Sequence, residues 1–235
     1  MIKKGKIIVV EGLDCCFKET ASKTIKKELD SIGIKSEIVS FPRYGNPSSV
    51  YIENMLRGNY KGINLKKYIT TLFMLEMMHT FATEIKEKIN NGTTIILDRY
   101  WYSNIYYQGN RNNEYGISEE WKSQIDEMID MAKDFKLPKP NLCIFMINTF
   151  DNMKKVLEKK ENKDNNEKNL KFMEEVYFKY ELFLEIYLTP DTRKKLGIPT
   201  NFFRVNCYYE STKNIKPRSI IANNIKNIIL KNFKR

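Results

Sequence analysis

The sequence is poor in the side chains that hold structural zinc, with one histidine, His79, and four cysteines in 235 residues. No pair of cysteines has the spacing of a structural zinc site, and a single histidine cannot complete one. Cys15 and Cys16 are adjacent and badly placed to bridge each other, so we expect reduced thiols in a reducing compartment. The composition therefore argues against zinc-stabilised and disulfide-stapled proteins.

Long apolar runs are also missing, because none approaches the roughly 18 residues that a membrane span requires. The amino-terminal stretch MIKKGKIIVVEG is basic and then apolar, as in a signal peptide. Its apolar part is only IIVV, and an acidic residue follows at once. We therefore interpret residues 6–10 as a core strand and expect a cytoplasmic protein without membrane contact.

Arginine is scarce, since only 8 of the 40 basic residues are arginine. The formal charge of +11 still favours anionic partners, either nucleotides or nucleic acid. The excess of Lys, Asn and Ile also fits a compositional bias of the source, and acids interleave with the lysines. A nucleic-acid-binding surface needs one continuous basic stripe with exposed aromatics, so we expect nucleotides rather than nucleic acid.

No internal repeat and no long flexible linker interrupts the chain, whose length suits one α/β domain. Five apolar runs are typical of strands, at residues 6–10, 36–41, 93–97, 142–147 and 202–206. Helix-length segments begin near residues 18, 48, 65, 118, 150, 169 and 216. This alternation predicts right-handed crossovers and a parallel sheet covered by helices on both faces.

The segment EGLDCCFKET, residues 11–20, joins the first strand to the first helix. A phosphate-binding loop is expected at such a junction, because backbone N–H groups and the helix N-terminus attract an anion there. The full signature is G-x-x-x-x-G-K-[ST], and this chain reads G-L-D-C-C-F-K-E-T. Gly12 and Lys18 fit the signature, while Phe17 replaces its second glycine and Glu19 replaces its hydroxyl.

Further segments carry a resemblance to thymidylate kinases. FPRYGNPSS, residues 41–49, follows the second strand, DRYWYSNIYYQG, residues 98–109, follows the third, and LPKPNLCIFMI, residues 137–147, leads into the fourth. The first loop resembles that family's E-G-x-D-G-x-G-K-x-T motif. The polar excursion EKKENKDNNEKN, residues 158–169, resembles its lid, with a plain solvated loop as the alternative. The resemblance extends from residue 7 to about residue 229.

The resemblance implies a three-layer P-loop NTPase fold of class α/β, with a five-stranded parallel sheet, helices on both faces and a small lid near residues 158–169. Residues 1–235 would form a single kinase domain. The implied reaction moves the ATP γ-phosphate to a pyrimidine deoxynucleotide, with dTMP as the expected acceptor, dTDP as the product and Mg²⁺ beside ATP. A homodimer formed through helices is expected. Two alternatives stay open: a catalytically impaired nucleotide-binding relative, and a basic nucleic-acid-binding protein.

Carried over residue by residue, the resemblance assigns the reaction to Lys18, Arg99 and Asp98. Lys18 would bridge the β- and γ-phosphates, and Arg99 would clamp the acceptor phosphate with a planar, permanently charged fork. Asp98, at the end of the third strand, would orient magnesium. Each residue has a structural alternative. Lys18 could be a solvated lysine at the helix start, Arg99 could form a purely structural salt bridge, and Asp98 could cap the next helix.

The resemblance also predicts three sets of binding residues. The ATP-binding set is Gly12, Cys15, Cys16, Phe17, Lys18, Glu19, Thr20 and, in the lid, Lys163, with Lys159 and Lys160 as further candidates. The acceptor-binding set is Asp14 on the 3′-hydroxyl, Phe41, Arg43 on the phosphate, Phe73 stacked on the base, Met77, Arg99, and Ser103, Tyr107 and Gln108 around the nucleoside. The metal set is Glu19 and Asp98. The alternative for Phe73 is a core aromatic of its helix.

Three departures from the family pattern have physical consequences. We expect Phe17 to take a negative φ with its ring turned outward, because a Cβ is disfavoured at positive φ. Glu19 would offer magnesium a carboxylate in place of the usual hydroxyl, while Thr20 could supply a hydroxyl only after a shift of helix register. Met77 stands where thymidylate kinases carry an arginine, and a thioether donates no hydrogen bond, so we expect a less strict reading of the base.

Overall fold

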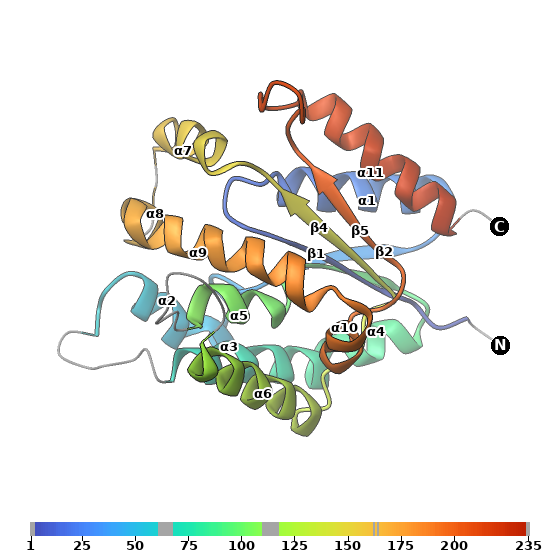
Figure 1. Ribbon diagram of the computed structural model, residues 1–235. Coiled ribbons are helices and arrows are strands. Elements are labelled where there is room, and N and C mark those ends of the chain that lie inside the picture. The colour runs from blue at the N-terminus through green and yellow to red at the C-terminus, as the bar shows by residue number, and fades with distance from the viewer. Residues whose placement is uncertain (1–2, 61–67, 110–117, 162, 164, 234–235) are drawn as a thin grey trace.

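The computed structural model describes residues 3–60, 68–109, 118–161, 163 and 165–233, which form three layers (Figure 1). The central layer is a parallel sheet with the strand order β2-β3-β1-β4-β5. The strands are β1 (Ile7–Gly12), β2 (Ser36–Ser40), β3 (Thr94–Asp98), β4 (Leu142–Ile147) and β5 (Phe202–Asn206). The predicted five-stranded parallel sheet is confirmed.

The middle strands β1 and β4 are buried along their whole length. Their apolar runs, IIVV and LCIFMI, suit strands that are covered on both faces. The register pairs Val10 with Asp98 of β3 and Gly12 with Met146 of β4. The chain therefore leaves β1 between two strands that end beside it, and ligands of open α/β sheets bind at such a switch point.

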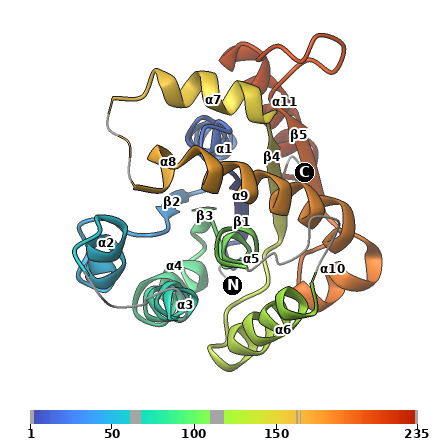
Figure 2. The same cartoon turned by 60° about the vertical axis from the view of Figure 1, so that its left-hand side comes forward.

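Helices cover both faces of the sheet (Figures 1 and 2). On one face, α1 (Lys18–Ser31) and α11 (Arg218–Phe233) pack against each other. The other layer contains α3 (Ile69–Thr80), α5 (Tyr102–Gln108), α6 (Glu119–Asp134) and α9 (Leu170–Leu182). The shorter elements are η1 (Pro47–Ser49), α2 (Val50–Leu56), η3 (Phe81–Ile85), α4 (Lys86–Asn90), α7 (Phe150–Glu158), α8 (Asn165–Lys168), η4 (Phe183–Tyr187) and α10 (Pro190–Leu196).

Helix α5 is held against both the sheet and its neighbouring helices. Trp121 of α6 is fully buried and donates its indole N–H to the carbonyl oxygen of Ile105 at 2.9 Å. On the other side, the ring of Tyr106 packs edge-on against Tyr180 of α9. Because α5 follows directly after β3, this packing fixes its side chains relative to the carboxyl end of the sheet.

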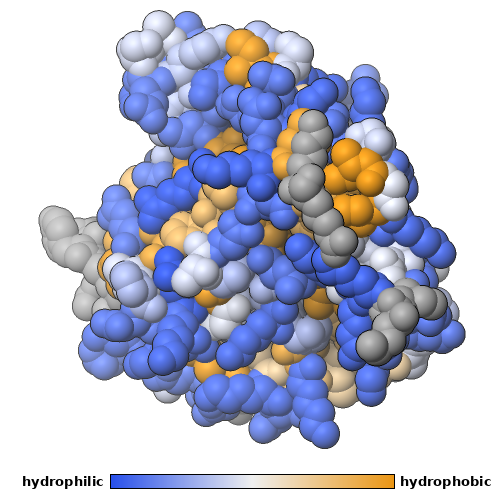
Figure 3. All heavy atoms as spheres, turned by 90° about the vertical axis from the view of Figure 1, so that its right-hand side faces the viewer, coloured by the Kyte–Doolittle hydropathy of each residue, from blue (hydrophilic) through white to orange (hydrophobic). Residues whose placement is uncertain are grey.

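The end of the molecule near both chain ends lies away from that edge of the sheet, and its surface is mostly hydrophilic with small apolar patches (Figure 3). Within the described residues, no helix combines the length and apolar character that a bilayer crossing needs. The predicted site residues gather at the opposite end, where β1 and β3 finish.

Candidate active site

Gly12 ends β1 and begins the loop to α1 with a φ of 149°. A Cβ at this position would lie only 2.8 Å from the carbonyl oxygen of Met146 on the neighbouring strand β4. Only glycine therefore allows the loop to leave the sheet so close to β4. This close approach carries the loop across the carboxyl ends of the strands.

The loop keeps two residues in the left-handed region, Cys15 with a φ of 63° and Phe17 with a φ of 60°. The expectation of a negative φ at Phe17 is wrong. Phe17 immediately precedes α1 and adopts the left-handed backbone conformation that glycine usually adopts at such a turn. No side chain caps the start of this helix. The ring of Phe17 is half-buried and packs against the hydrophobic core instead of turning outward. Such residues cost roughly 1–3 kcal/mol each, so neighbouring groups must hold them.

A cavity of about 610 Å³ opens beside this loop, a size that suits a small-molecule ligand. The predicted site residues in its wall are Asp14, Cys15, Cys16, Phe17, Lys18, Glu19, Thr20, Phe41, Phe73, Met77, Asp98, Arg99, Ser103, Tyr107 and Gln108. The predicted residues outside the wall are Gly12, Arg43, Lys159 and Lys163, while the further lid candidate Lys160 lies in the wall. One cavity thus gathers side chains from the first loop, the ends of β2 and β3, and helices α3 and α5.

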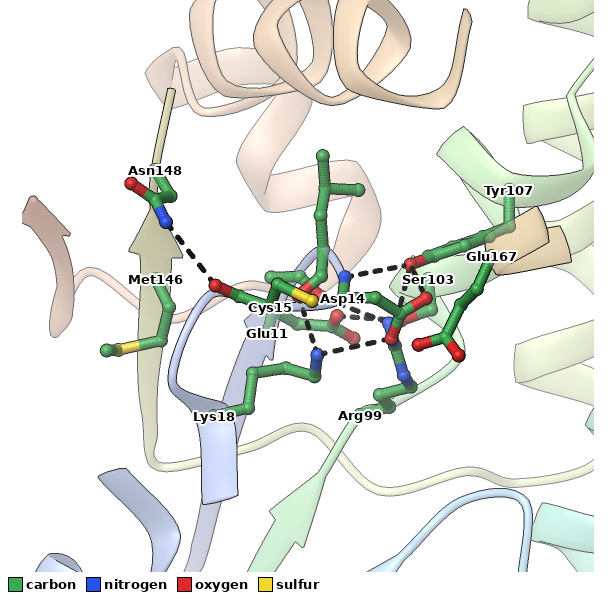
Figure 4. Close-up of polar contacts among 12 residues, drawn as sticks. Glu11, Asp14, Cys15, Lys18, Arg99, Ser103, Tyr107, Met146, Asn148 and Glu167 are labelled. Atoms are coloured by element: carbon green, nitrogen blue, oxygen red, sulfur yellow. Dashed lines mark hydrogen bonds and ion pairs between the residues drawn. The ribbon is translucent and has the colours of Figure 1, made fainter. Parts of the chain in front are cut away.

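Lys18 begins α1, and its side chain is almost completely buried in the cavity wall. The Nζ atom donates to the carbonyl oxygen of Leu13 at 2.7 Å and lies 3.8 Å from Oδ1 of Asp14 (Figure 4). A lysine at a helix N-terminus adds its charge to the positive end of the helix dipole. The loop therefore presents a favourable site for an anion.

Arg99 follows β3 and turns back toward the same loop with a φ of 73°. Its guanidinium forms an ion pair with Asp14 and donates to the carbonyl oxygen of Gly12 at 3.0 Å and to the hydroxyl of Tyr107 at 3.2 Å. Burial tends to lower the pKa of Arg99, but the nearby acidic groups, with Asp14 first among them, together outweigh burial and raise this pKa well above its usual value. Arg99 is thus a fixed, permanent cation of the cavity.

Asp14 lies between the two cations. Burial tends to raise the pKa of its carboxyl, but Arg99 and Lys18 hold that pKa well below its usual range. The hydroxyl of Tyr107 donates to Oδ2 of Asp14 at 2.7 Å. Asp14 is therefore ionised and fixed in orientation, and can accept a hydrogen bond from a ligand hydroxyl.

Glu11 is a site residue that the sequence analysis missed. It is fully buried in β1 and accepts hydrogen bonds from the backbone N–H of Tyr100 and the hydroxyl of Ser103, both at 2.8 Å, and from the hydroxyl of Tyr106. Burial raises the pKa of Glu11, although these hydrogen bonds and Arg99 oppose the shift. The network ties β1 to the first turn after β3. An acidic residue directly after a buried apolar strand could have signalled it, because buried acids need partners.

Asn104 is a second missed residue, beside Ser103 on α5. Its side chain lines the cavity, is only 4% exposed, and has an Nδ2 atom without a hydrogen-bond partner. A buried amide without a partner costs free energy, so a polar edge bound in the cavity would remove that cost. No spacing in the sequence marks Asn104 as a binding residue.

Arg43 does not reach the cavity wall. Its Nη1 atom pairs with Glu84 of η3 at 2.5 Å, and its backbone N–H donates to Oε1 of Glu76 at 2.7 Å. The next residue, Tyr44, lines the cavity instead. The predicted role of Arg43 on the acceptor phosphate therefore has no geometric support, because a partner 41 residues further along the chain holds its charge elsewhere.

The lid side of the cavity also differs from expectation. Lys163 is half-buried outside the wall, whereas Lys160 lines the cavity and donates to both carboxylate oxygens of Glu167 at 2.6 and 2.7 Å. Arg218, at the start of α11, also lines the cavity and acts electrostatically on Glu19 of α1. The cavity wall therefore contains the cations Lys160 and Arg218 besides Lys18 and Arg99, and Arg218 is not among the predicted residues.

The two predicted metal ligands line the cavity in different states. The Glu19 carboxylate is largely exposed and pairs with Lys23 at 2.5 Å, while Asp98 is half-buried at the end of β3. Within the described residues, no group of three or more His, Cys, Asp or Glu side chains forms a metal centre. Magnesium is commonly held by one or two carboxylates together with phosphate oxygens and water. Asp98 fits such a site, and Glu19 would first have to leave Lys23.

Glu76 of α3 supports the turn that leads to Tyr44. Its side chain is only 2% exposed, Oε1 accepts the N–H of Arg43, and Oε2 has no hydrogen-bond partner. Burial raises the pKa of Glu76 to about 7, an effect that Arg43 opposes and Glu53 reinforces. The turn that places Tyr44 in the cavity wall is therefore held by a carboxyl group whose pKa lies near neutral pH.

We predict that Glu76→Gln flattens the dependence of stability on pH. The folded protein holds a proton on Glu76 up to about pH 7, but the unfolded chain releases it near 4.5. The native state thus binds more protons between these values, and the free energy of unfolding falls as pH rises through this window. Urea unfolding at pH 5 and pH 8 should show the wild type losing about 2–3 kcal/mol more than the variant. Equal losses would contradict the titration of Glu76.

Comparison with known proteins places this geometry in a family. Residues 10–195 match the family described as thymidylate kinase. Over 185 residues the chain is 31% identical to the thymidylate kinase of Brachyspira hyodysenteriae, covering 79% of this chain and 84% of that protein. It is 27% identical over 144 residues to human thymidylate kinase, covering 61% of each. The solved thymidylate kinase of Candida albicans matches in fold, with a TM-score of 0.70 and 24% identity over 97% of this chain and 92% of that one. The chain belongs to the thymidylate kinase family.

Proposed function

We propose that this chain transfers the γ-phosphate of ATP to a pyrimidine deoxynucleoside monophosphate, with dTMP as acceptor and dTDP as product. One observation carries the proposal: Lys18 and Arg99 converge from two different strand ends on Asp14, inside one cavity. Phosphoryl transfer needs positioned charge more than covalent chemistry, and two cations held beside a cavity supply it. The similarity to thymidylate kinases supports the same reaction.

Lys18 and Arg99 share the charge that develops on the transferring group. In the ligand-free arrangement the ammonium of Lys18 bonds the Leu13 carbonyl, a neutral partner that phosphate oxygens would outcompete. Arg99 keeps Asp14 as a partner and can still direct other N–H groups at the acceptor phosphate. The reaction is thus assisted by positioning and by charge, without a covalent intermediate.

The remaining wall residues divide into a donor end and an acceptor end. At the donor end, Lys160 and Arg218 line the cavity and would face the phosphates of ATP, and Asp98 would hold magnesium directly or through water. Magnesium neutralises phosphate charge when it is bound. At the acceptor end, Asp14 accepts from the 3′-hydroxyl and Phe73 stacks on the base. Glu19 would become a second magnesium ligand once its carboxylate breaks the ion pair with Lys23.

The departures in the loop do not favour the impaired, non-catalytic alternative. Phe17 keeps the left-handed backbone that glycine normally supplies, so the path of the loop is retained although the residue is changed. The helix begins at Lys18, where the signature places it. The altered side chains therefore leave the backbone cradle in place.

We also propose a cytoplasmic homodimer. The four free cysteines fit a reducing compartment. Most residues of helix α3 are apolar, yet Leu75 is exposed, one turn before the exposed His79. Apolar helix residues are normally buried, and a second copy of the chain would cover Leu75.

Lys18→Ala should lower turnover at least about a hundredfold, because it removes a cation from the transition-state charge. The pure protein is incubated with ATP, magnesium and dTMP, and ADP is followed. Lys27→Ala, which changes an exposed lysine of the same helix, is the matched control and should keep its turnover. Unchanged turnover in Lys18→Ala would remove Lys18 from the reaction, and an inactive wild type would refute the proposed function.

Acceptor choice should be relaxed, with dTMP, dUMP and dCMP used within about two orders of magnitude of one another. Met77 cannot supply the charge-assisted bond that an arginine would give, worth roughly 1.5–3 kcal/mol or about ten- to a hundredfold. The amide of Asn104 can form a hydrogen bond with the base. No protein group holds its Nδ2 atom, so the amide can rotate to donate to thymine or to accept from cytosine. The thymine methyl adds roughly 0.8 kcal/mol, about fourfold over uracil.

The measurement is kcat/KM for the three acceptors in three proteins. Asn104→Ala should weaken all three by similar factors, whereas Met77→Arg should restore a preference for dTMP. A preference of the wild type for dTMP over dCMP beyond about a thousandfold would show that another donor, such as Gln108, reads the base.

Leu75→Glu should convert the proposed dimer into a monomer, because it places a charge in an apolar contact. Leu170→Glu, which changes an exposed leucine on α9, is the control and should stay dimeric. Sedimentation velocity at several concentrations distinguishes the two. A monomeric wild type, or a dimeric Leu75→Glu, would reject this face as the interface.

A further inference from the structure

We propose that Asn148 and Asn152 are positioning residues of the ATP site, which hold the loop between β1 and α1 in a left-handed geometry that its non-glycine residues resist. We call these two side chains the asparagine clamp. The inference rests on the proposed function, because it assigns the clamp to the ATP-binding half of that site. Neither asparagine lines the cavity, so the clamp acts through the loop and not on the ligand.

The asparagine clamp contacts the loop through a hydrogen bond to the backbone carbonyl of Cys15. Nδ2 of Asn148 donates to the carbonyl oxygen of Cys15 at 3.3 Å (Figure 4). Oδ1 of Asn148 accepts from the backbone N–H of Thr149 at 3.0 Å and from Nδ2 of Asn152 at 3.2 Å. Because a backbone N–H can only donate, the amide of Asn148 has one possible orientation, and its NH₂ group must face Cys15.

Asn152 anchors the clamp to a third part of the chain. Its Nδ2 atom also donates to the carbonyl oxygen of Lys213, in the connection between β5 and α11, at 2.8 Å. Asn148 directly follows β4, and Asn152 lies in the first turn of α7. Both side chains are only 2% exposed, so water does not compete for these bonds. Hydrogen bonds thus connect the loop, through Asn148, to the end of β4 and, through Asn152, to the connection that follows β5.

The loop needs such a tie because of its residues. Cys15 and Phe17 both have positive φ, a conformation that glycine adopts freely and other residues resist. Such strain persists only where the surroundings over-determine the backbone. The Cys15 carbonyl is held by Asn148, and the next carbonyl, that of Cys16, accepts from the Cys207 thiol at 3.5 Å. A trans peptide points C=O and N–H in opposite directions, so the N–H of Phe17 is directed away from Cys207.

A merely structural asparagine and a clamp make different predictions. Loss of a structural asparagine would weaken the protein whatever the loop sequence is. Loss of the clamp should matter only while the loop contains residues that resist the left-handed region. The two roles therefore separate in a loop with glycine at both strained positions, Cys15→Gly/Phe17→Gly.

The experiment compares Asn148→Ala in the natural loop and in the glycine loop. Two readouts are used: the dissociation constant of ATP, and the rate at which iodoacetamide alkylates Cys16 without any ligand, measured by mass spectrometry. Cys16 is 1% exposed, and burial raises the pKa of its thiol to about 12, so a closed loop protects it. Cys143, within β4, reports global unfolding. Asn141→Ala is the matched control, because Asn141 accepts from a β1 backbone N–H, that of Ile7, at the other end of the sheet.

In the natural loop, Asn148→Ala should weaken ATP binding and speed Cys16 alkylation by about tenfold each, the scale of one lost hydrogen bond. Cys143 alkylation and the KM for dTMP should not change, and Asn141→Ala should resemble the wild type. In the glycine loop both effects should shrink to less than about twofold. Equal effects in the two loops, or none in the natural loop, would overturn the clamp. If the wild type binds no ATP, the proposed function fails, and Cys16 alkylation alone decides the clamp.

Discussion

The ion pair between Asp14 and Arg99 is the interaction on which the rest of the site depends. It joins the loop after β1 to the first residue after β3, two strands that are paired up to Val10 and Asp98. Without Asp14, Lys18 and Arg99 would lose the carboxylate that both of them contact, and breaking a buried ion pair by removing one partner costs about 3–5 kcal/mol. With it, Lys18 and Arg99 can be held in place before any phosphate arrives, which is the condition for electrostatic preorganisation.

Asp14 and Glu11 are two acids of the same region whose different surroundings give them different roles. Asp14 faces the cavity between two cations, which lower the pKa of its carboxyl, whereas burial raises the pKa of Glu11. The first is available to a ligand, and the second is enclosed by Tyr100, Ser103 and Tyr106. Glu11 thus contributes by fixing the turn that carries Arg99 and by orienting α5, and every hydrogen bond it accepts comes from that segment.

The sequence was informative where function depends on the order of elements along the chain. Alternating apolar strands and helices predicted the parallel sheet, and the resemblance assigned both the loop after β1 and the segment after β3 to one site, where one cavity contains residues of both. It was uninformative where a distant partner decides which way a side chain points. Glu84 holds Arg43 outside the cavity, and Glu167 holds Lys160 in its wall. The sign of φ at Phe17 likewise depends on packing that no local pattern records.

The presence of phenylalanine where the signature has glycine can be understood by comparing two opposing free energies. The left-handed backbone at Phe17 costs roughly 1–3 kcal/mol. Burying a phenylalanine side chain contributes roughly 1.5–3 kcal/mol when complete, and this ring is half-buried against the core. Replacing glycine also narrows the unfolded ensemble, worth about 0.4–1 kcal/mol. The cost of the left-handed backbone is therefore similar in size to the two favourable contributions together. Phenylalanine can replace glycine here without a change in the path of the backbone. The loop thus keeps a left-handed turn directly before α1 but relies on packing and side-chain contacts for what glycine supplies through conformational freedom.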